Sequence, residues 1–417
     1  MAELRPLDQP QTTPLEHGPR STHEGDRVVH LDPTGGHPGC AFAPQPVEPF
    51  DVSLGRTALC HEWFTAYGGA EETAALIART LGIRDVYTLV AEQSLVEQLF
   101  DGPVRQTWIS KLPRSRTNWS RYLPLMPAAW SSVDLGGYDT VITSSHAASN
   151  AVRTRPDTRR ICYCYTPMRY AWEWREEIGR VPKLVRPAWP LAAGTFRRLD
   201  RGWASRVASF IVISEFIRRR VQHAYGRDAV VCHPPVDTAF YQPQDVARED
   251  FYLCLGRMVP YKHLDFAILA AAGARRRLVL VGSGPEMERL KRLPGAARWA
   301  EFRGTVPREE VRDLLCRCRA LLFPGVEDFG IAMAEAQATA TPVVALGRGG
   351  ATEIVAHGET GLLYDRPDPG GLAEAIAAFE RFESTGGFSP SRIRDNALRF
   401  ARSTFPSRFT AALGGCL

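Results

Sequence analysis

The stretch Phe323-Pro-Gly-Val-Glu-Asp-Phe-Gly-Ile-Ala-Met-Ala-Glu335 joins an apolar run to a helix of small residues through a short acidic loop. The apolar residues 320–323 predict a buried strand that stops at the Pro-Gly pair, and residues 330–339 predict the helix. The first turn of a helix leaves backbone N–H groups free at the positive end of its dipole, which suits a bound phosphate. Glu327 in the loop and Glu335 in the helix would then hold a sugar nucleotide from both ends. The structural alternative is that Glu335 lies on the helix surface and that Glu327 only keeps the loop soluble.

Strands and helices alternate on both sides of this stretch. Near-continuous apolar strands that alternate with helices are typical of a parallel sheet covered on both faces, so we predict an α/β fold with two doubly wound, Rossmann-like domains. Such domains bind ligands at the carboxyl ends of their strands, and two of them facing each other form a central cleft. The predicted strands are residues 56–63, 85–90, 138–143, 160–164 and 208–214 in the first half and 251–255, 277–281, 301–303, 320–323, 342–346 and 361–363 in the second.

The domain boundary is predicted at residues 237–249, which are polar, contain Pro243 and follow a pair of prolines. His233-Pro-Pro-Val-Asp237 cannot continue a regular element, because paired prolines remove hydrogen-bond donors and fix φ. The first residues lack apolar periodicity and predict an extension without regular structure. We therefore predict an extension over residues 1–50, an N-terminal domain over 51–240, a C-terminal domain over 241–390 and a C-terminal segment over 391–417. This last segment is predicted to hold a single closing helix over residues 391–413, with room to return to the N-terminal domain.

Composition favours an ordinary soluble protein. The 417 residues are 44% apolar and 23% charged, and the net charge of +5 does not favour a nucleic-acid partner. The nine cysteines are scattered without metal-site spacing, and no His/Asp/Glu pattern indicates a metal or another cofactor. The first residues lack a secretory signal and no apolar run could span a bilayer. We predict a cytoplasmic protein, with a peripheral contact at the inner face of the membrane left open.

Residues 168–206 interrupt the alternation with Arg, Trp and Pro. The segment is too apolar for a free loop and too basic for a core. It could be a surface that faces the substrate or a membrane, or a helical hairpin packed on the domain. The hairpin is the favoured interpretation.

A second motif, Leu255-Gly-Arg-Met-Val-Pro-Tyr-Lys262, follows a predicted strand in the second half. The strand ends at Gly256, and Arg257 and Lys262 flank the turn. Two fixed cations at the carboxyl edge of a strand would neutralise a diphosphate and the charge that develops on it as it leaves. Since the chain has only four lysines, the position of Lys262 favours this hypothesis over two solvated surface cations.

The first half offers weaker signals. Gly68 and Gly69 open a predicted helix and would let a phosphate approach the backbone. His146 follows a predicted strand end, where site residues collect. His61, Glu62 and His233 are further chemical candidates, although a lone histidine is more often structural.

Taken together, these motifs resemble those of the family 4 retaining glycosyltransferases of the two-domain GT-B type. The carriers are the E-x₇-E signature from Glu327 to Glu335 and the Gly-Arg…Lys element before it. The first half resembles the branch that uses GDP-mannose, and the resemblance covers about residues 55–413. Its N-terminal motifs are His61-Glu-Trp63, Tyr67-Gly-Gly-Ala-Glu71, Ser144-Ser-His146, Tyr163-Cys-Tyr-Thr-Pro-Met-Arg-Tyr170 and Pro234-Pro-Val-Asp237.

The resemblance implies roles for individual residues. The N-terminal domain would bind the acceptor and the C-terminal domain the nucleotide sugar, with no metal required. Arg257 and Lys262 would hold the diphosphate, Glu327 the sugar hydroxyls and Glu335 the ribose. The candidate catalytic residues are Glu327, Arg257, Lys262 and His146. The candidate donor-binding residues are Gly68, Gly69, Gly256, Arg257, Lys262, Phe329, Gly330, Ile331 and Glu335, the backbone of residues 329–331 seating the sugar and phosphate.

The acceptor side carries one departure from the family pattern. Tyr165, Arg169 and Tyr170 are candidates to face the acceptor or the sugar, and many relatives are expected to carry histidine at the position of Tyr165. Tyrosine is a poorer base near neutral pH, so a proton-relay role for that position is in doubt. In this family the leaving diphosphate is usually pictured as accepting the proton of the acceptor.

The predicted function is transfer of a hexosyl group, mannose or a related sugar, from a nucleotide diphosphate sugar to a hydroxyl group with retention. GDP-mannose is the favoured donor, and the acceptor is a saccharide, a lipid-linked saccharide or a small natural product. Two alternatives stay open. The chain could be a non-catalytic sugar-nucleotide-binding partner of another transferase, or a sugar-nucleotide epimerase on the same fold.

Overall fold

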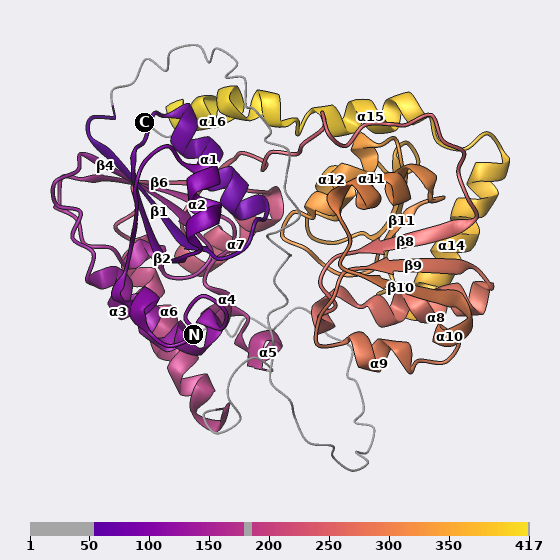
Figure 1. Cartoon of the computed structure of the whole chain (residues 1–417), viewed down its shortest axis with the longest axis horizontal. Coiled ribbons are helices and arrows are strands. Elements are labelled where there is room, and N and C mark those ends of the chain that lie inside the picture. Colours follow the sequence, from indigo (N-terminus) through magenta and orange to yellow (C-terminus); the bar gives the residue numbers. More distant parts are fainter. Residues whose placement is uncertain (1–53, 179–185, 416–417) are drawn as a thin grey trace, which may run out of the picture.

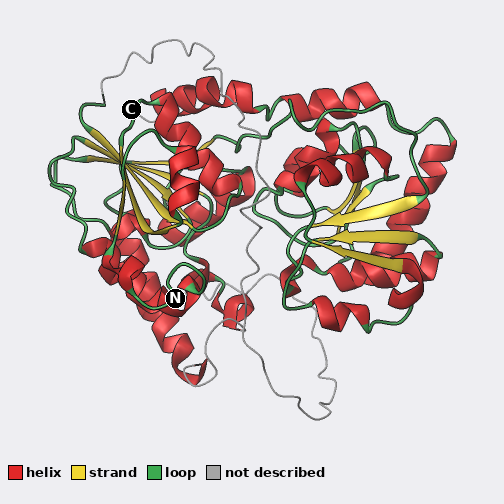
Figure 2. Ribbon diagram, viewed as in Figure 1, coloured by secondary structure: helices red, strands yellow, loops and turns green. Residues whose placement is uncertain are grey.

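The computed structural model describes residues 54–178 and 186–415 and folds them into two α/β lobes (Figure 1). The extension predicted over residues 1–50 lies outside the described residues. Each lobe has a parallel sheet between layers of helices (Figure 2), so the predicted fold class is confirmed.

The N-terminal lobe is built on seven parallel strands within the described part of the chain, in the order β3-β2-β1-β4-β5-β6-β7. Strands β1 and β4 in its middle are almost wholly buried, as expected where a parallel sheet is covered on both faces. The strands are β1 (Thr57–Phe64), β2 (Asp85–Ala91), β3 (Val104–Gln106), β4 (Thr140–Ser145), β5 (Arg159–Cys164), β6 (Ser209–Val212) and β7 (Val230–Val231). The helices are α1 (Gly69–Thr80), α2 (Gln93–Leu99), α3 (Met126–Ser131), α4 (Arg169–Trp172), α5 (Trp174–Glu177), α6 (Trp189–Ala204) and α7 (Glu215–Tyr225), with short 3₁₀ turns η1 (Trp108–Lys111), η2 (Trp119–Leu125), η3 (Ser149–Ala151) and η5 (Arg186–Ala188).

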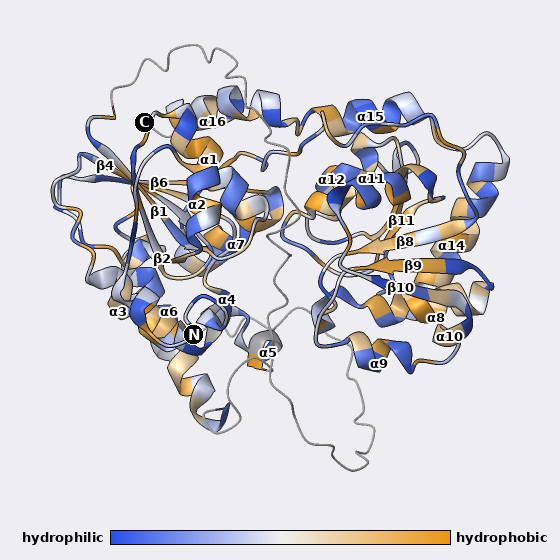
Figure 3. Cartoon of the chain, viewed as in Figure 1, coloured by the Kyte–Doolittle hydropathy of each residue, from blue (hydrophilic) through white to orange (hydrophobic). Residues whose placement is uncertain are grey.

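The C-terminal lobe has six parallel strands among its described residues, in the order β10-β9-β8-β11-β12-β13. The neighbouring strands β8 and β9 are predominantly hydrophobic (Figure 3) and buried. The strands are β8 (Phe251–Leu255), β9 (Arg277–Val281), β10 (Ala300–Gly304), β11 (Leu321–Phe323), β12 (Val343–Leu346) and β13 (Gly361–Tyr364). The helices are α8 (Leu264–Ala274), α9 (Met287–Lys291), α10 (Ala296–Trp299), α11 (Arg308–Arg317), α12 (Ile331–Ala338), α13 (Ala351–Ile354), α14 (Pro369–Ser384), α15 (Pro390–Leu398) and α16 (Phe405–Gly414), with 3₁₀ turns η6 (Pro260–Lys262) and η7 (Arg402–Thr404).

The chain crosses between the lobes twice, and the two crossings lie side by side. Val236 in the linker donates its N–H to Phe400 O at 2.9 Å, and Arg402 donates its N–H to Val236 O at 2.8 Å. Helix α15 then packs against α12 in the C-terminal lobe and α16 against α1 in the N-terminal lobe (Figure 1).

The prediction of a single closing helix over residues 391–413 is wrong. The helix ends after Leu398, and a new helix, α16, starts at Phe405. Pro406 lies in the first turn of α16, where its missing N–H costs nothing; inside a continuous helix its ring would clash with the preceding turn. The break lets the chain pass from one lobe to the other.

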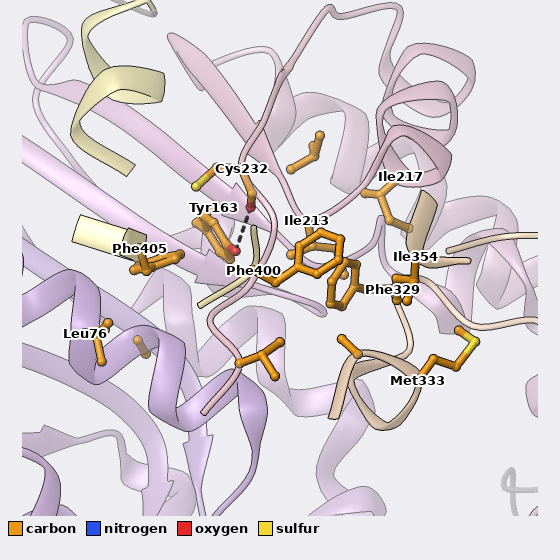
Figure 4. Packing of buried hydrophobic residues seen from close by; sticks show 14 of the residues in the cluster. Leu76, Tyr163, Ile213, Ile217, Cys232, Phe329, Met333, Ile354, Phe400 and Phe405 are labelled. Carbon is orange, nitrogen blue, oxygen red and sulfur yellow. Dashed lines mark hydrogen bonds between the residues drawn. The ribbon is translucent and has the colours of Figure 1, made fainter. Parts of the chain in front are cut away.

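Buried apolar side chains continue from one lobe into the other beside these crossings. The ring of Phe329, which follows the acidic loop, lies next to Ile213 and Phe400 in Figure 4, with the Phe329 and Phe400 ring centroids 5.3 Å apart. This packing fixes one end of the acidic loop against the N-terminal lobe.

Residues 169–177 and 189–204 of the Arg/Trp-rich segment form α4, α5 and α6, which pack on the N-terminal lobe. Trp189, Ala193 and Asp200 on α6 are buried, as the packed interpretation predicts. None of the helices in the described residues is both long and apolar enough to cross a membrane.

Candidate active site

Lys262 and Glu327 meet at the carboxyl edge of the second sheet. Lys262 closes the turn after β8 and Glu327 lies in the loop after β11, so neighbouring strands deliver both. The Lys262 ammonium lies 2.7 Å from Oε1 of Glu327. Gly256, at the end of β8, has φ +127, and a Cβ there would come within 2.8 Å of Lys262 Nζ. Glycine at this position therefore permits the close approach of the ammonium.

The pKa of Lys262 reflects this pairing. Burial alone would lower the pKa of the ammonium, but Glu327 and Tyr261 outweigh burial and raise it above its ordinary value. Arg257 lies close enough for its charge to oppose the positive form of Lys262, and its own side chain is exposed. Lys262 is thus a charged, shielded cation with a second cation nearby.

A cavity of about 330 Å³ lies between the lobes at this pair. The C-terminal lobe contributes Lys262, Glu327 and the backbone at the start of α12, and the N-terminal lobe contributes Tyr165 and the start of α1. Its lining is Gly69, Ala70, Tyr165, Ile213, Pro234, Lys262, Phe323, Glu327, Asp328, Phe329, Gly330, Ile331 and Ala332.

The N-terminus of α12 faces Gly69 across the cavity. Gly330 has φ +95 and precedes the first residue of α12, and no side chain caps this end of the helix. A Cβ on Gly69 would overlap Cδ1 of Ile331, so the glycine lets the two lobes approach closely. The uncapped N–H groups suit an anion, as predicted from the sequence.

Glu335 lies further along α12 and is half-buried. Burial raises the pKa of its carboxyl to about 7, although the charge of Arg308 and a hydrogen bond from Tyr241 oppose this effect. Asp237 adds to the rise and also accepts a hydrogen bond from Arg308 at 2.8 Å. Glu335 does not line the cavity around Lys262, and Arg308 and Tyr241 are neighbours that no sequence motif indicated.

Tyr165 belongs to a buried hydrogen-bond chain whose direction is fixed. Its hydroxyl donates to the backbone oxygen of Ala70 at 2.9 Å, since a carbonyl only accepts. The hydroxyl must then accept from Ser144 at 3.0 Å, and Ser144 must accept from Nδ1 of His61, also at 3.0 Å. His61 therefore carries its proton on Nδ1, and its Nε2 faces the Glu71 carboxylate at 4.0 Å.

The register of the sheet explains this chain. His61 on β1 pairs with Ser144 on β4, and Tyr165 directly follows β5, so adjacent strands deliver the three side chains to one edge. The chain ties the sheet to the first turn of α1, which carries Gly69 into the cavity. Burial raises the pKa of Tyr165 above its ordinary range, so its hydroxyl stays protonated.

His146 lies behind this group. Its ring packs edge-on against Trp63 at 4.4 Å and lies 5.9 Å from the Tyr165 ring, and burial lowers its pKa well below the ordinary value. Glu62 holds the loop that carries His146. Its buried carboxylate accepts from the backbone N–H groups of Ala147 and Ser149 at 3.0 and 2.8 Å.

The remaining candidates are not among the residues that line this cavity. Arg169 reaches across to Asp328, the residue after Glu327, whereas Tyr170 is half-buried against Trp189 beside a smaller apolar hollow. Gly68 precedes α1, where a Cβ would come within 2.8 Å of Glu71 Oε2. His233 in the linker bonds Glu353 at 3.0 Å and lies outside the cavity lining. Within the described residues, no three His, Cys, Asp or Glu side chains gather as a metal site would require.

Two glycosyltransferase family models match the chain. The model described as Glycosyltransferase Family 4 matches residues 67–240, and the model described as Glycosyl transferases group 1 matches residues 237–397. The matches meet at the linker, so each model covers one lobe.

Curated relatives carry related names. The GDP-mannose-dependent alpha-(1-6)-phosphatidylinositol monomannoside mannosyltransferase of Mycobacterium tuberculosis is 34% identical over 218 residues, which are 45% of this chain and 55% of the relative. The D-inositol 3-phosphate glycosyltransferase of Acidothermus cellulolyticus is 37% identical over 190 residues, which are 38% of this chain and 42% of the relative. The chain thus spans about half the length of the curated relatives it matches.

Solved structures share the fold at low identity. Anabaena HepE, solved with UDP-glucose, superposes with a TM-score of 0.64 at 19% identity over 86% of this chain and 99% of that one. The sucrose-phosphate synthase of Thermosynechococcus elongatus has a TM-score of 0.64 at 16% identity over 86% and 98%. The resemblance predicted from the motifs is confirmed: the chain belongs to the group 1 and family 4 glycosyltransferases of GT-B fold.

Proposed function

We propose that this chain is a retaining glycosyltransferase that moves mannose or a related hexose from a nucleotide diphosphate sugar, GDP-mannose being favoured, to a hydroxyl group of an acceptor. The observation that carries the proposal is the Lys262–Glu327 pair in a cavity that both lobes line. A shielded cation beside a carboxylate offers one partner for phosphate and one for sugar hydroxyls.

Binding of the donor would separate this pair. The diphosphate would compete for the ammonium of Lys262 and for the exposed guanidinium of Arg257, which together balance its charge. Glu327 would then accept hydrogen bonds from sugar hydroxyls, and the uncapped N–H groups at the start of α12 would face a phosphate oxygen. Glu335 would accept from the ribose hydroxyls.

The transfer step needs no protein base in this scheme. The acceptor oxygen bonds to the anomeric carbon on the face that the diphosphate leaves, the carbon–oxygen bond to phosphate breaks, and the proton of the acceptor passes to the leaving phosphate oxygen. Tyr165 fits a positioning role, because its proton is committed to Ala70. Arg257 and Lys262 would stabilise the leaving diphosphate, and no metal is proposed.

The donor and acceptor rest on weaker support. GDP-mannose is favoured by the names of the mycobacterial relatives. A saccharide, a lipid-linked saccharide or a small natural product would suit the acceptor side, where α4 carries Arg169 and Tyr170. A lipid-linked acceptor would bring the N-terminal lobe to a membrane surface from the cytoplasm.

A panel of nucleotide sugars tests the proposal. GDP-mannose should raise the melting temperature and, with a mannoside acceptor, release GDP in the presence of EDTA. Glu327→Gln and Lys262→Met should each lower the rate at least 100-fold, whereas Lys291→Met, which removes a lysine paired with Glu288 on the surface, should not change it. The proposal fails if no nucleotide sugar binds or turns over.

The same panel separates the two alternatives. An epimerase would change the sugar of the donor with no acceptor present. A non-catalytic partner would bind the donor and never release the nucleoside diphosphate. Only the transferase releases it in proportion to glycosylated acceptor.

A further inference from the structure

Asp328 follows Glu327 in the acidic loop and points to the other lobe. Its Oδ2 accepts from Arg169, and its Oδ1 accepts from Arg220 at 2.9 Å. Both arginines belong to the N-terminal lobe, on α4 and α7. Both carboxylate oxygens of Asp328 are therefore engaged by arginines of that lobe.

Glu173 completes a four-membered group of charges. Its Oε1 lies 2.5 Å from Nη2 of Arg220, and its Oε2 lies 3.8 Å from Nε of Arg169. Two carboxylates balance two guanidinium groups, and all four side chains are only 14–25% exposed. Pairs this well shielded are screened much less by salt than surface pairs.

The backbone oxygen of Asp328 is also hydrogen-bonded to the N-terminal lobe. Asp328 O accepts from the Ser214 hydroxyl at 2.6 Å, and that hydroxyl accepts from the N–H of Ile217 as the N-cap of α7. Beside it, Glu353 of the C-terminal lobe accepts from the N–H groups of Glu215 and Phe216 at 2.8 and 3.1 Å. The acidic loop and helix α13 of the C-terminal lobe thus meet the start of α7.

Arg169 links this group to the acceptor side. It lies four residues after Tyr165, and its guanidinium lies 5.6 Å from the ring centroid of Tyr261, the neighbour of Lys262. One side chain therefore contacts both donor loops of the C-terminal lobe, beside Lys262 and beside Glu327.

We propose that Asp328 is a positioning residue that fixes the donor loop to the acceptor-side segment when the two lobes are together. It acts through Glu327 and Arg169 and does not itself bind the donor. Without the Asp328 carboxylate the lobes would separate more readily. Water would then reach the bound donor more often, and hydrolysis of the donor would rise relative to transfer. The proposal rests on the proposed function for its kinetic consequences and on the ion pairs alone for its structural ones.

Asp328→Asn tests the coupling with little change in size. We expect kcat for transfer to fall about 10- to 100-fold, because small misplacements of reacting groups have such effects. The KM of the donor should change less than threefold, and hydrolysis of the donor relative to transfer should rise. The radius of gyration from small-angle X-ray scattering should increase. Asp313→Asn is the matched control, because Asp313 pairs with Arg317 on the same helix and away from the cleft.

Two variants of Arg220 distinguish loss of the ion pair with Asp328 from misfolding. Arg220→Met should reproduce the effects of Asp328→Asn, and Arg220→Lys, which keeps the charge, should restore most of the transfer rate. The double variant Arg220→Met/Asp328→Asn should lose less than the sum of the single losses, since the partners share one interaction.

Two outcomes would overturn the proposal. Wild-type kcat, hydrolysis ratio and radius of gyration in Asp328→Asn would show that the bridge does no positioning. A loss of donor affinity as large as the loss of transfer would make Asp328 a donor ligand instead. If the wild-type protein transfers no sugar, the proposed function fails, and the scattering comparison still decides the coupling of the lobes.

Discussion

The ammonium of Lys262 lies 2.7 Å from Oε1 of Glu327, so each charge neutralises the other. Removing one partner leaves the other charged and largely shielded from water. Lys262→Met should therefore lower the free energy of unfolding by about 3 kcal/mol. The double variant Lys262→Met/Glu327→Gln should regain most of this stability and none of the activity. Urea titration and a transfer assay on the same samples test both, and additive stability losses would contradict the pairing.

The raised pKa of Glu335 predicts a pH-dependent stability. A folded-state pKa of about 7, above the ordinary 4.5, means that the folded protein holds this proton more tightly. The contribution is fully present below about pH 4.5 and is lost as the pH rises through about 7. Glu335→Gln should therefore gain up to about 3 kcal/mol over the wild type at pH 8 and lose that advantage at pH 5. Thermal unfolding of both proteins between pH 5 and 8 measures the difference, and parallel curves would contradict it.

The affinity for the donor should depend on the protonation of the Glu335 carboxyl and should rise with pH. Ribose hydroxyls donate to a carboxylate, so donor binding favours the ionised form and releases a proton near pH 7. Affinity should rise with pH up to about 7 and then level off. Calorimetry in buffers of different ionisation enthalpy would detect the released proton, and Glu335→Gln should release none.

Tyr165→Phe should loosen the start of α1. The change removes the hydroxyl that donates to Ala70 O and accepts from Ser144. The free energy of unfolding should fall by about 2 kcal/mol. Tyr122→Phe is the control, since its hydroxyl makes one exposed bond to Pro113 O and should cost less than about 1 kcal/mol. The transfer rate should fall less than tenfold. Loss of all transfer at unchanged stability would instead make the hydroxyl a reacting group.

Glu62→Gln should destabilise the loop that carries His146. The buried carboxylate accepts from two backbone N–H groups and from Trp130 Nε1. In the glutamine variant the side-chain NH₂ group would face one or more of these donors and could not accept from them. We expect a loss of about 2–3 kcal/mol in urea unfolding. Glu97→Gln, which changes an exposed residue bonded to Gln93, should have almost no effect. Equal losses of stability in the two variants would contradict the role of Glu62 in holding the loop.

The alternating apolar runs predicted the two sheets because parallel strands buried on both faces need continuous hydrophobic sequence. Strand β3 was missed because Val-Arg-Gln lies at a sheet edge and is only partly buried. Strand β7 has two residues, too few to show any period. A continuous predicted helix over 391–413 ignored the first-turn preference of Pro406.

The part of the site built by Lys262 and Glu327 was predictable, because each residue belongs to a motif that directly follows a predicted strand. Lys262 and Glu327 come from neighbouring strands, so their meeting follows from the sheet order. The partners of Asp328 and Glu335 were not predictable, because Arg169, Arg220 and Arg308 approach from elements distant in sequence. The contacts of Asp328 depend on how the two lobes dock, and the contact of Glu335 with Arg308 depends on how α11 and α12 pack within one lobe. No local sequence pattern encodes either arrangement.

The return of α16 to the N-terminal lobe has a consequence for synthesis. The fully buried Phe405 and Phe409 pack near Tyr163 of β5, so this lobe lacks part of its core until α16 is made. The C-terminal lobe contains its own core cluster and can fold before α16 emerges from the ribosome. The usual vectorial order of domain folding would then be reversed, with the first-translated domain completed last.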